Sequence, residues 1–147
     1  MARRFAVITE YRDKDIDLPQ RKTRLSAGYD LAAATDVVLP PGEVVVVPTG
    51  LKAYMEEDEV LLIFIRSSLA TKRHIHLANQ VGVIDADYRD NPQNEGHILL
   101  GLENRGAEPM LIAKGDRVAQ AIFTKYLAVD DDAAGGERLG GIGSTGA

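Results

Sequence analysis

The sequence predicts an all-β domain, a jelly-roll-like β-barrel with one short helix. Three observations support this: the apolar runs are short, turn residues separate them closely, and helical periodicity is scarce. The chain has 147 residues, 45% hydrophobic and 27% charged, which suits one globular domain with a sizeable core. We expect residues 1–129 to form this domain, and residues 130–147 to form a flexible linker and a glycine-rich C-terminal segment.

The first expected strand, residues 5–11, alternates weakly between apolar and polar side chains. Residues 37–39 and 44–47 flank the turn Pro40-Pro41-Gly42, which is a hairpin signal. The strongest apolar run leads directly into the helix expected at residues 67–73, with Ser67 or Ser68 as its cap. That run and the remaining expected strands are residues 60–65, 51–55, 75–78, 81–84, 98–102, 110–112 and 118–126.

Composition narrows the functional classes. The formal net charge is -5, so a long anionic polymer such as nucleic acid is a poor partner. The absence of cysteine removes disulfides and thiolate chemistry, and the three histidines lack a metal-ligand spacing and are read as surface residues. The longest apolar run, residues 60–65, is too short to cross a membrane. We therefore expect a cytoplasmic protein without membrane or nucleic-acid partners.

Residues 65–69 join the strongest strand to the start of the predicted helix. Free N–H groups at a helix N-terminus favour an anion, and the Arg66 guanidinium suits phosphate oxygens. A serine cap beside a surface arginine explains the same residues without a ligand. The glycine-rich residues 140–146 could wrap a phosphate with backbone N–H groups, or form an unstructured end.

Asp85 and Asp87 follow an apolar strand and are separated by one residue, so both face one side of an extended chain. A partly enclosed Asp85 could act as a general base on water. A turn in which the aspartates bond their own backbone is the alternative. Further along, Asp116 and Arg117 are interpreted as a structural pair that locks a turn. Gln120 is expected to share a face with Val118, where its amide needs a partner.

Five segments, taken together and in this order, resemble the five motifs of the trimeric dUTPase family, in a bacterial or phage-like form. They are residues 27–31, 66–70, 79–88, 115–120 and 138–146. The resemblance implies a jelly-roll subunit, a homotrimer with active sites at subunit interfaces, and hydrolysis of dUTP to dUMP and pyrophosphate. It also implies Mg²⁺ bound mainly through the substrate phosphates, which agrees with the scarcity of metal-ligand patterns.

The resemblance also assigns roles to individual residues. Asp85 would deprotonate the water that attacks the α-phosphorus, and Asp30 would support the metal through water. Tyr88 would press against the deoxyribose. The phosphates would be held by Arg66, Ser67, Ser68 and Gln120, and the uracil read by Asn79 and the backbone of Val83 and Ile84. The C-terminal lid would use Arg138, Ile142, Gly143, Ser144 and Thr145.

Two departures from the family pattern stand out. Ile142 occupies the lid position where an aromatic side chain usually stacks on the uracil, which predicts a looser lid and weaker substrate affinity. Residues 89–96 form an extra polar loop after Tyr88, read as a surface loop. Its place beside the site leaves open a regulatory role or a protein partner.

Two rival functions are compatible with parts of the same sequence. A dCTP deaminase shares the fold and a similar segment at residues 66–70, but the glutamate it needs is replaced by Gly101, three residues before Asn104. The arginine expected after Ala70 is Thr71. The second rival is a nucleotide-gated binding protein that engages a partner. Such a sensor would tolerate the loss of Asp85, whereas a catalyst would not.

Overall fold

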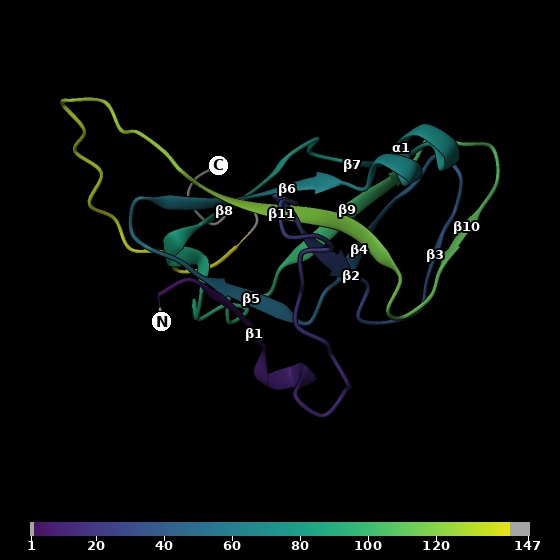
Figure 1. Ribbon diagram of the computed structural model, residues 1–147, viewed down its shortest axis with the longest axis horizontal. Helices are drawn as coiled ribbons and strands as arrows, with labels where there is room; N and C mark the ends of the chain where they lie inside the picture. The colour runs from purple at the N-terminus through teal and green to yellow at the C-terminus, as the bar shows by residue number, and fades with distance from the viewer. Residues whose placement is uncertain (1, 142–147) are drawn as a thin grey trace.

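A computed structural model describes residues 2–141 of the chain (Figure 1). Within these described residues, eleven strands and one α-helix form an all-β domain, as the sequence predicts. The elements are β1 (Arg4–Val7), a 3₁₀ turn η1 (Thr9–Tyr11), β2 (Tyr29–Ala32), β3 (Val37–Leu39), β4 (Val44–Pro48), β5 (Leu51–Tyr54), β6 (Glu59–Ile65), α1 (Ser67–Arg73), β7 (Ile75–Leu77), β8 (Gly82–Asp85), a 3₁₀ turn η2 (Ala86–Tyr88), β9 (Leu99–Asn104), β10 (Met110–Ile112) and β11 (Arg117–Lys125).

The strands pair antiparallel in four small sheets rather than in one closed barrel. The largest has the order β2-β11-β6-β8, a second has the order β4-β9-β7, and β1 pairs with β5 and β3 with β10. In Figure 1, β11 crosses the middle of the molecule, where β6 pairs with it from Ala119 to Lys125. The candidate site residues lie toward the two ends of this long antiparallel pair.

Three local predictions need correction. Residues 9–11 do not continue the first strand, because the Ile8 carbonyl accepts a hydrogen bond from the Tyr11 N–H and turns the chain into η1. Strand β2 was not among the expected strands. The helix spans residues 67–73 as predicted, but Arg66 occupies its N-cap position and no side chain caps it. Ser67 and Ser68 are therefore the first residues of the helix and not its caps.

The core consists of apolar side chains from all four sheets. Leu61 and Ile63 of β6 are almost fully buried, and so are Leu31 of β2 and Leu102 of β9. Asn104, 1% exposed, lies at the end of β9, where its Nδ2 donates to the carbonyls of Leu39 and Glu108 at 2.9 and 2.8 Å. A buried amide needs such partners, and these bonds tie β9 to β3.

Within residues 2–141, no helix is long and apolar enough to cross a membrane.

Candidate functional site

Three of the expected phosphate-binding and metal-supporting residues meet at one end of the largest sheet. Gln120 of β11 lies opposite Asp30 of β2, and Arg66 directly follows β6, with its N–H donating to the Val118 carbonyl at 3.1 Å. Together with Lys22 and Gly28, they line a cavity of about 340 Å³. Ser67 and Ser68 begin the helix next to Arg66. We call this group the phosphate end.

A bulge sets the direction of Gln120. The register of β11 against β2 shifts between Arg117 and Ala119, and as a result Val118 and Ala119 are consecutive buried residues. Gln120 therefore does not share the buried face, which corrects the expectation from simple alternation. A Cβ added at Gly28 would overlap Gln120 Oε1, so the absence of a side chain at residue 28 is what admits the amide.

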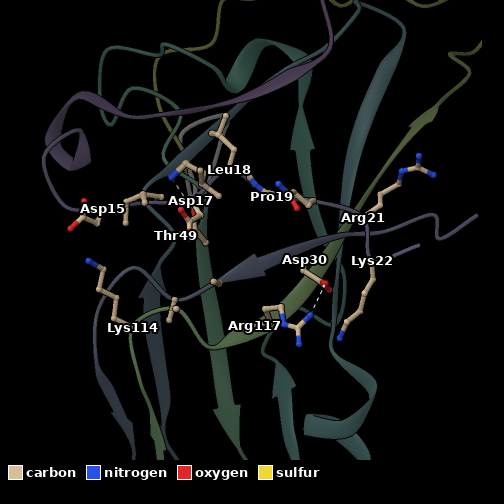
Figure 2. A pocket seen from close by; sticks show the side chains of 16 residues that line it. Asp15, Asp17, Leu18, Pro19, Arg21, Lys22, Asp30, Thr49, Lys114 and Arg117 are labelled. Carbon is tan, nitrogen blue, oxygen red and sulfur yellow. Dashed lines mark hydrogen bonds and ion pairs between the residues drawn. The ribbon is translucent and has the colours of Figure 1, made fainter. Parts of the chain in front are cut away.

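Asp30 has a charged neighbour that the sequence did not reveal. Arg117 Nη1 lies 3.4 Å from Asp30 Oδ2, and Figure 2 shows the two side chains pointing toward each other across the wall of a cavity of about 720 Å³. The expected Asp116–Arg117 pair is therefore wrong in part. Asp116 does lock its turn, because its carboxylate accepts the Ala113 N–H at 2.9 Å, but Arg117 turns to Asp30.

Asp85 lies at the other end of β6, opposite Val60. Its side chain is 51% exposed, so it is less enclosed than expected. Asp85 and Asp87 converge on the Arg138 guanidinium, Asp85 through a short ion pair and Asp87 at 3.2 Å. The aspartates converge across the turn η2 and not along an extended chain. They border a cavity of about 430 Å³ together with Tyr126 and Arg138.

The hairpin between β7 and β8 presents polar groups at the start of β8, where Gly82 pairs with Ile63 of β6. Asn79 is exposed in the turn, where its carbonyl accepts the Val81 N–H at 2.7 Å. Strand β8 is the edge of its sheet, pairing only with β6 among the described strands. Of the consecutive residues Val83 and Ile84, one therefore points its N–H and C=O away from β6, where they are available to a ligand. This is the arrangement that reading a base edge with the backbone requires.

Tyr88 is buried, 8% exposed, with its hydroxyl donating to the His97 carbonyl at 2.6 Å and accepting from Asn94 Nδ2 at 2.8 Å. Burial raises the pKa of the Tyr88 hydroxyl. Both hydrogen bonds of the hydroxyl are thus made to the loop that follows Tyr88. Any contact with a sugar would therefore be made by the ring. The ring role expected from the sequence remains a prediction.

The loop at residues 89–96 is more organised than the surface loop the sequence suggested. Asn91 is buried; its Nδ2 donates to the Tyr88 carbonyl at 2.7 Å, and its Oδ1 accepts the N–H groups of Gln93 and Asn94. Asp90 and Glu95 both bind the Lys52 ammonium, at 2.5 and 2.8 Å. These contacts fix the loop on β5. A partner role for its outer surface remains a prediction.

His97 closes this loop and is buried, which corrects its interpretation as a surface residue. Its Nε2 accepts the Gly50 N–H at 2.8 Å, so the neutral ring is the form that the fold uses. Burial lowers the pKa of His97 accordingly. Among residues 2–141, no three histidine or acidic side chains gather as metal ligands.

The comparisons with known proteins now decide the family. Residues 14–146 match the dUTPase family model. A deoxyuridine 5'-triphosphate nucleotidohydrolase of Lactococcus lactis is 48% identical over 99% of this chain and 98% of its own length. The chain belongs to the dUTPase family. A relative of the same name from Desulfitobacterium hafniense is 42% identical over 92% of this chain and 91% of its own.

The solved dUTPase structures agree with the fold. The crystal structure of the Streptococcus mutans dUTPase has a TM-score of 0.83 at 45% identity, covering 87% of this chain and 99% of that one. A dUTPase from Staphylococcus aureus phage phi11, at 22% identity, has a TM-score of 0.74 over 91% of this chain and 96% of its own, and shows a shared fold. The predicted dUTPase-like, jelly-roll-like class is thereby confirmed.

Within this dUTPase fold, a single chain does not bring the expected site together. Asp85 lies opposite Val60, whereas Arg66 follows Ile65 at the far end of the same strand. Arg66 is six positions after Val60, which at about 3.3 Å per residue is about 20 Å. The expected lid residues Ile142, Gly143, Ser144 and Thr145 lie outside the described residues. Sequence reasoning also missed Lys22 at the phosphate end, because only the folded chain places it beside Arg66.

Proposed function

We propose that this chain is a dUTP diphosphatase that hydrolyses dUTP to dUMP and pyrophosphate with Mg²⁺. The observation that carries the proposal is the 48% identity to a curated dUTP nucleotidohydrolase along nearly the full length of both chains. Such an enzyme limits the incorporation of uracil into DNA and supplies dUMP.

In the proposed reaction, a water oxygen bonds to the α-phosphorus, and the bond from that phosphorus to the oxygen bridging it to the β-phosphate breaks. Asp85 accepts the proton of the water, which can reach its half-exposed carboxylate. Arg66, Ser67, Ser68 and Gln120 would hold the phosphates and stabilise the charge that develops on them. The positions of Arg66 and Gln120 on one cavity wall support this role.

Specificity for deoxyuridine would come from the β7–β8 hairpin and the turn after it. The Asn79 amide and the open edge of Val83 and Ile84 can match the donors and acceptors of uracil. The Tyr88 ring would leave no room for a 2′-hydroxyl. Arg138 would close over the γ-phosphate with Ser144 and Thr145, while Ile142 covers the base and Gly143 lends its N–H.

Magnesium would be bound mainly through the three phosphates of the substrate. The carboxylate of Asp30 faces the phosphate end, and oxygen ligands with retained waters suit this ion. Asp30 would act through one of those waters, since its carboxylate also faces the Arg117 guanidinium. When bound, Mg²⁺ would neutralise part of the phosphate charge and orient the triphosphate.

The active form would be a homotrimer with sites between subunits. The distance of about 20 Å between the levels of Asp85 and Arg66 supports this, since a triphosphate cannot bring both to one α-phosphorus within a single chain. A second copy can instead place its phosphate end beside the Asp85 of the first. Closed symmetric assemblies repeat such a heterologous contact in a ring.

The proposed function is tested with four nucleotides. The purified protein is incubated with Mg²⁺ and dUTP, dCTP, dTTP or UTP, and pyrophosphate and nucleoside monophosphate are measured. We expect rapid release of pyrophosphate from dUTP alone. Ammonia from dCTP would assign the chain to the deaminases, and no turnover with retained dUTP binding would assign it to the sensors.

A further inference from the structure

The described end of the C-terminal segment, residues 138–141, lies on the body of its own chain. Residues 127–137 before it are exposed throughout, with Leu127 at 98% exposure, so this stretch does little to direct the segment. In contrast, the Arg138 side chain is only 13% exposed, and Gly140 is buried. The position of the segment is therefore decided by its own contacts.

Two contacts of different kinds hold these residues. The first is the ionic contact of Arg138 with Asp85 and Asp87. The second is neutral: the Gly141 N–H donates to Gln93 Oε1 at 2.8 Å. Whenever Arg138 engages a phosphate, as the proposed function requires, it gives up the carboxylates. The contact with Gln93 involves no charge and does not compete with the phosphate.

The two glycines fit Gln93 because they lack side chains. A Cβ at Gly140 would overlap Gln93 Oε1 and lie 2.8 Å from its Cδ. A Cβ at Gly141 would lie 3.1 Å from the Tyr88 ring and 3.2 Å from Asn94 Nδ2. Both distances are tighter than ordinary contacts, so the glycine pair lets the chain pass close to the loop.

Gln93 is itself held in place by the extra loop. Its N–H donates to Asn91 Oδ1 at 3.0 Å, and the loop is fixed to Lys52 through Asp90 and Glu95. The backbone of Gln93 is thus held before the C-terminal segment arrives, so only its side chain has to be ordered when Oε1 accepts the Gly141 N–H.

We propose that Gln93 is a positioning residue, which anchors the C-terminal segment at Gly141 and so keeps Arg138 beside the site. This inference rests on the proposed function, and it gives the extra loop a role inside the enzyme. Gln93 touches no reacting atom. It acts through the backbone of Gly141, three residues after the guanidinium that would meet the γ-phosphate.

The first test needs no substrate. Trypsin cleaves after Arg138 only when this arginine leaves its contacts, and mass spectrometry detects the released peptide beginning at Leu139. We expect Gln93→Leu, which keeps size and loses the acceptor, to raise the cleavage rate about two- to ten-fold, the range for one exposed hydrogen bond. Gln93→Glu keeps an acceptor and should restore protection. Gln20→Leu is the matched control for loss of an exposed glutamine.

The second test uses turnover. Gln93→Leu should raise KM for dUTP about two- to ten-fold with a smaller change in kcat, because the segment must be ordered anew for each substrate. Gly140→Ala should reproduce both effects, and the double variant should add little to either single one.

Wild-type cleavage and KM in Gln93→Leu would overturn the proposal, as would additive effects in the double variant. A loss of kcat with unchanged cleavage would overturn it too, because it would give Gln93 a different role. If the wild-type protein does not hydrolyse dUTP, the proposed function is wrong. The trypsin experiment is independent of this result: rapid cleavage of the wild-type protein after Arg138 would show that Gln93 does not anchor Gly141.

Discussion

The two ends of β6 carry different parts of the candidate site and are built differently. At the phosphate end, Arg66 and Gln120 are held by the backbone of paired strands, and the bulge in β11 determines where the amide points. At the other end, Asp85 is half exposed at the tip of an edge strand, and a segment from the far end of the chain covers it. The geometry of the phosphate end is therefore determined by strand pairing within the largest sheet, whereas that of the Asp85 end depends on contacts from distant segments.

The largest expected effect lies at the Asp85 end. Asp85→Asn should lower kcat for dUTP about 10²- to 10⁴-fold, because the amide cannot accept the proton of the attacking water. Binding of dUTP should persist. Asp87→Asn is the matched control, since Asp87 also binds Arg138 but is not the proposed base. Full-rate pyrophosphate release by Asp85→Asn would remove the catalytic assignment.

Mixing two inactive variants tests whether the ends act across subunits. Arg66→Ala and Asp85→Asn each disable one end, so co-refolded trimers should contain intact sites at about one quarter of the wild-type number if each site combines two chains. Pyrophosphate release from the mixture should then greatly exceed that of either variant alone. A mixture no more active than its components would place both ends in one chain's site.

A smaller effect is expected from Gly28→Ala at the phosphate end. The new methyl group would displace the flexible Gln120 amide, so KM for dUTP should rise about ten-fold, as expected for one hydrogen bond to a charged group. The melting temperature should change little. Gly101→Ala, whose Cβ would lie 3.7 Å from its nearest neighbour, serves as the control. Unchanged KM and kcat for dUTP would show that Gln120 does not contact the phosphates.

The smallest effect concerns acid stability near the Asp85 end. Burial lowers the pKa of His97, so the folded state keeps it neutral while the unfolded chain takes up a proton below about pH 6.5. Stability should therefore fall as pH drops below 6.5, by about 2–4 °C in Tm for each kcal/mol lost. His97→Gln, which can still accept from Gly50, should flatten the change between pH 6.5 and 5. An equally steep fall in the variant would assign it to other groups.

Much of the fold could be predicted from the sequence. The helix at residues 67–73 has the expected bounds, and most strands begin and end within one or two residues of their predicted limits, because apolar runs and turn residues act locally. Strand β2 was missed since its four residues contain no β-branched side chain and run into Ala33 and Ala34, which favour strands weakly. The turn η1 was missed because the turn after Ile8 depends on its bond to Gly50.

By itself, the sequence determined the all-β class, the family and the types of side chain available, since composition, period and motif order are properties of the chain alone. The tertiary structure decided which of these groups meet. The pairing of Arg117 with Asp30, the burial of His97 and the contact of Gln93 with Gly141 each join residues that are at least 47 positions apart. Such contacts produce no periodic pattern in the sequence. They depend on the strand register, on the bulge in β11 and on the conformation of a loop, and these are determined by the packing of the whole chain.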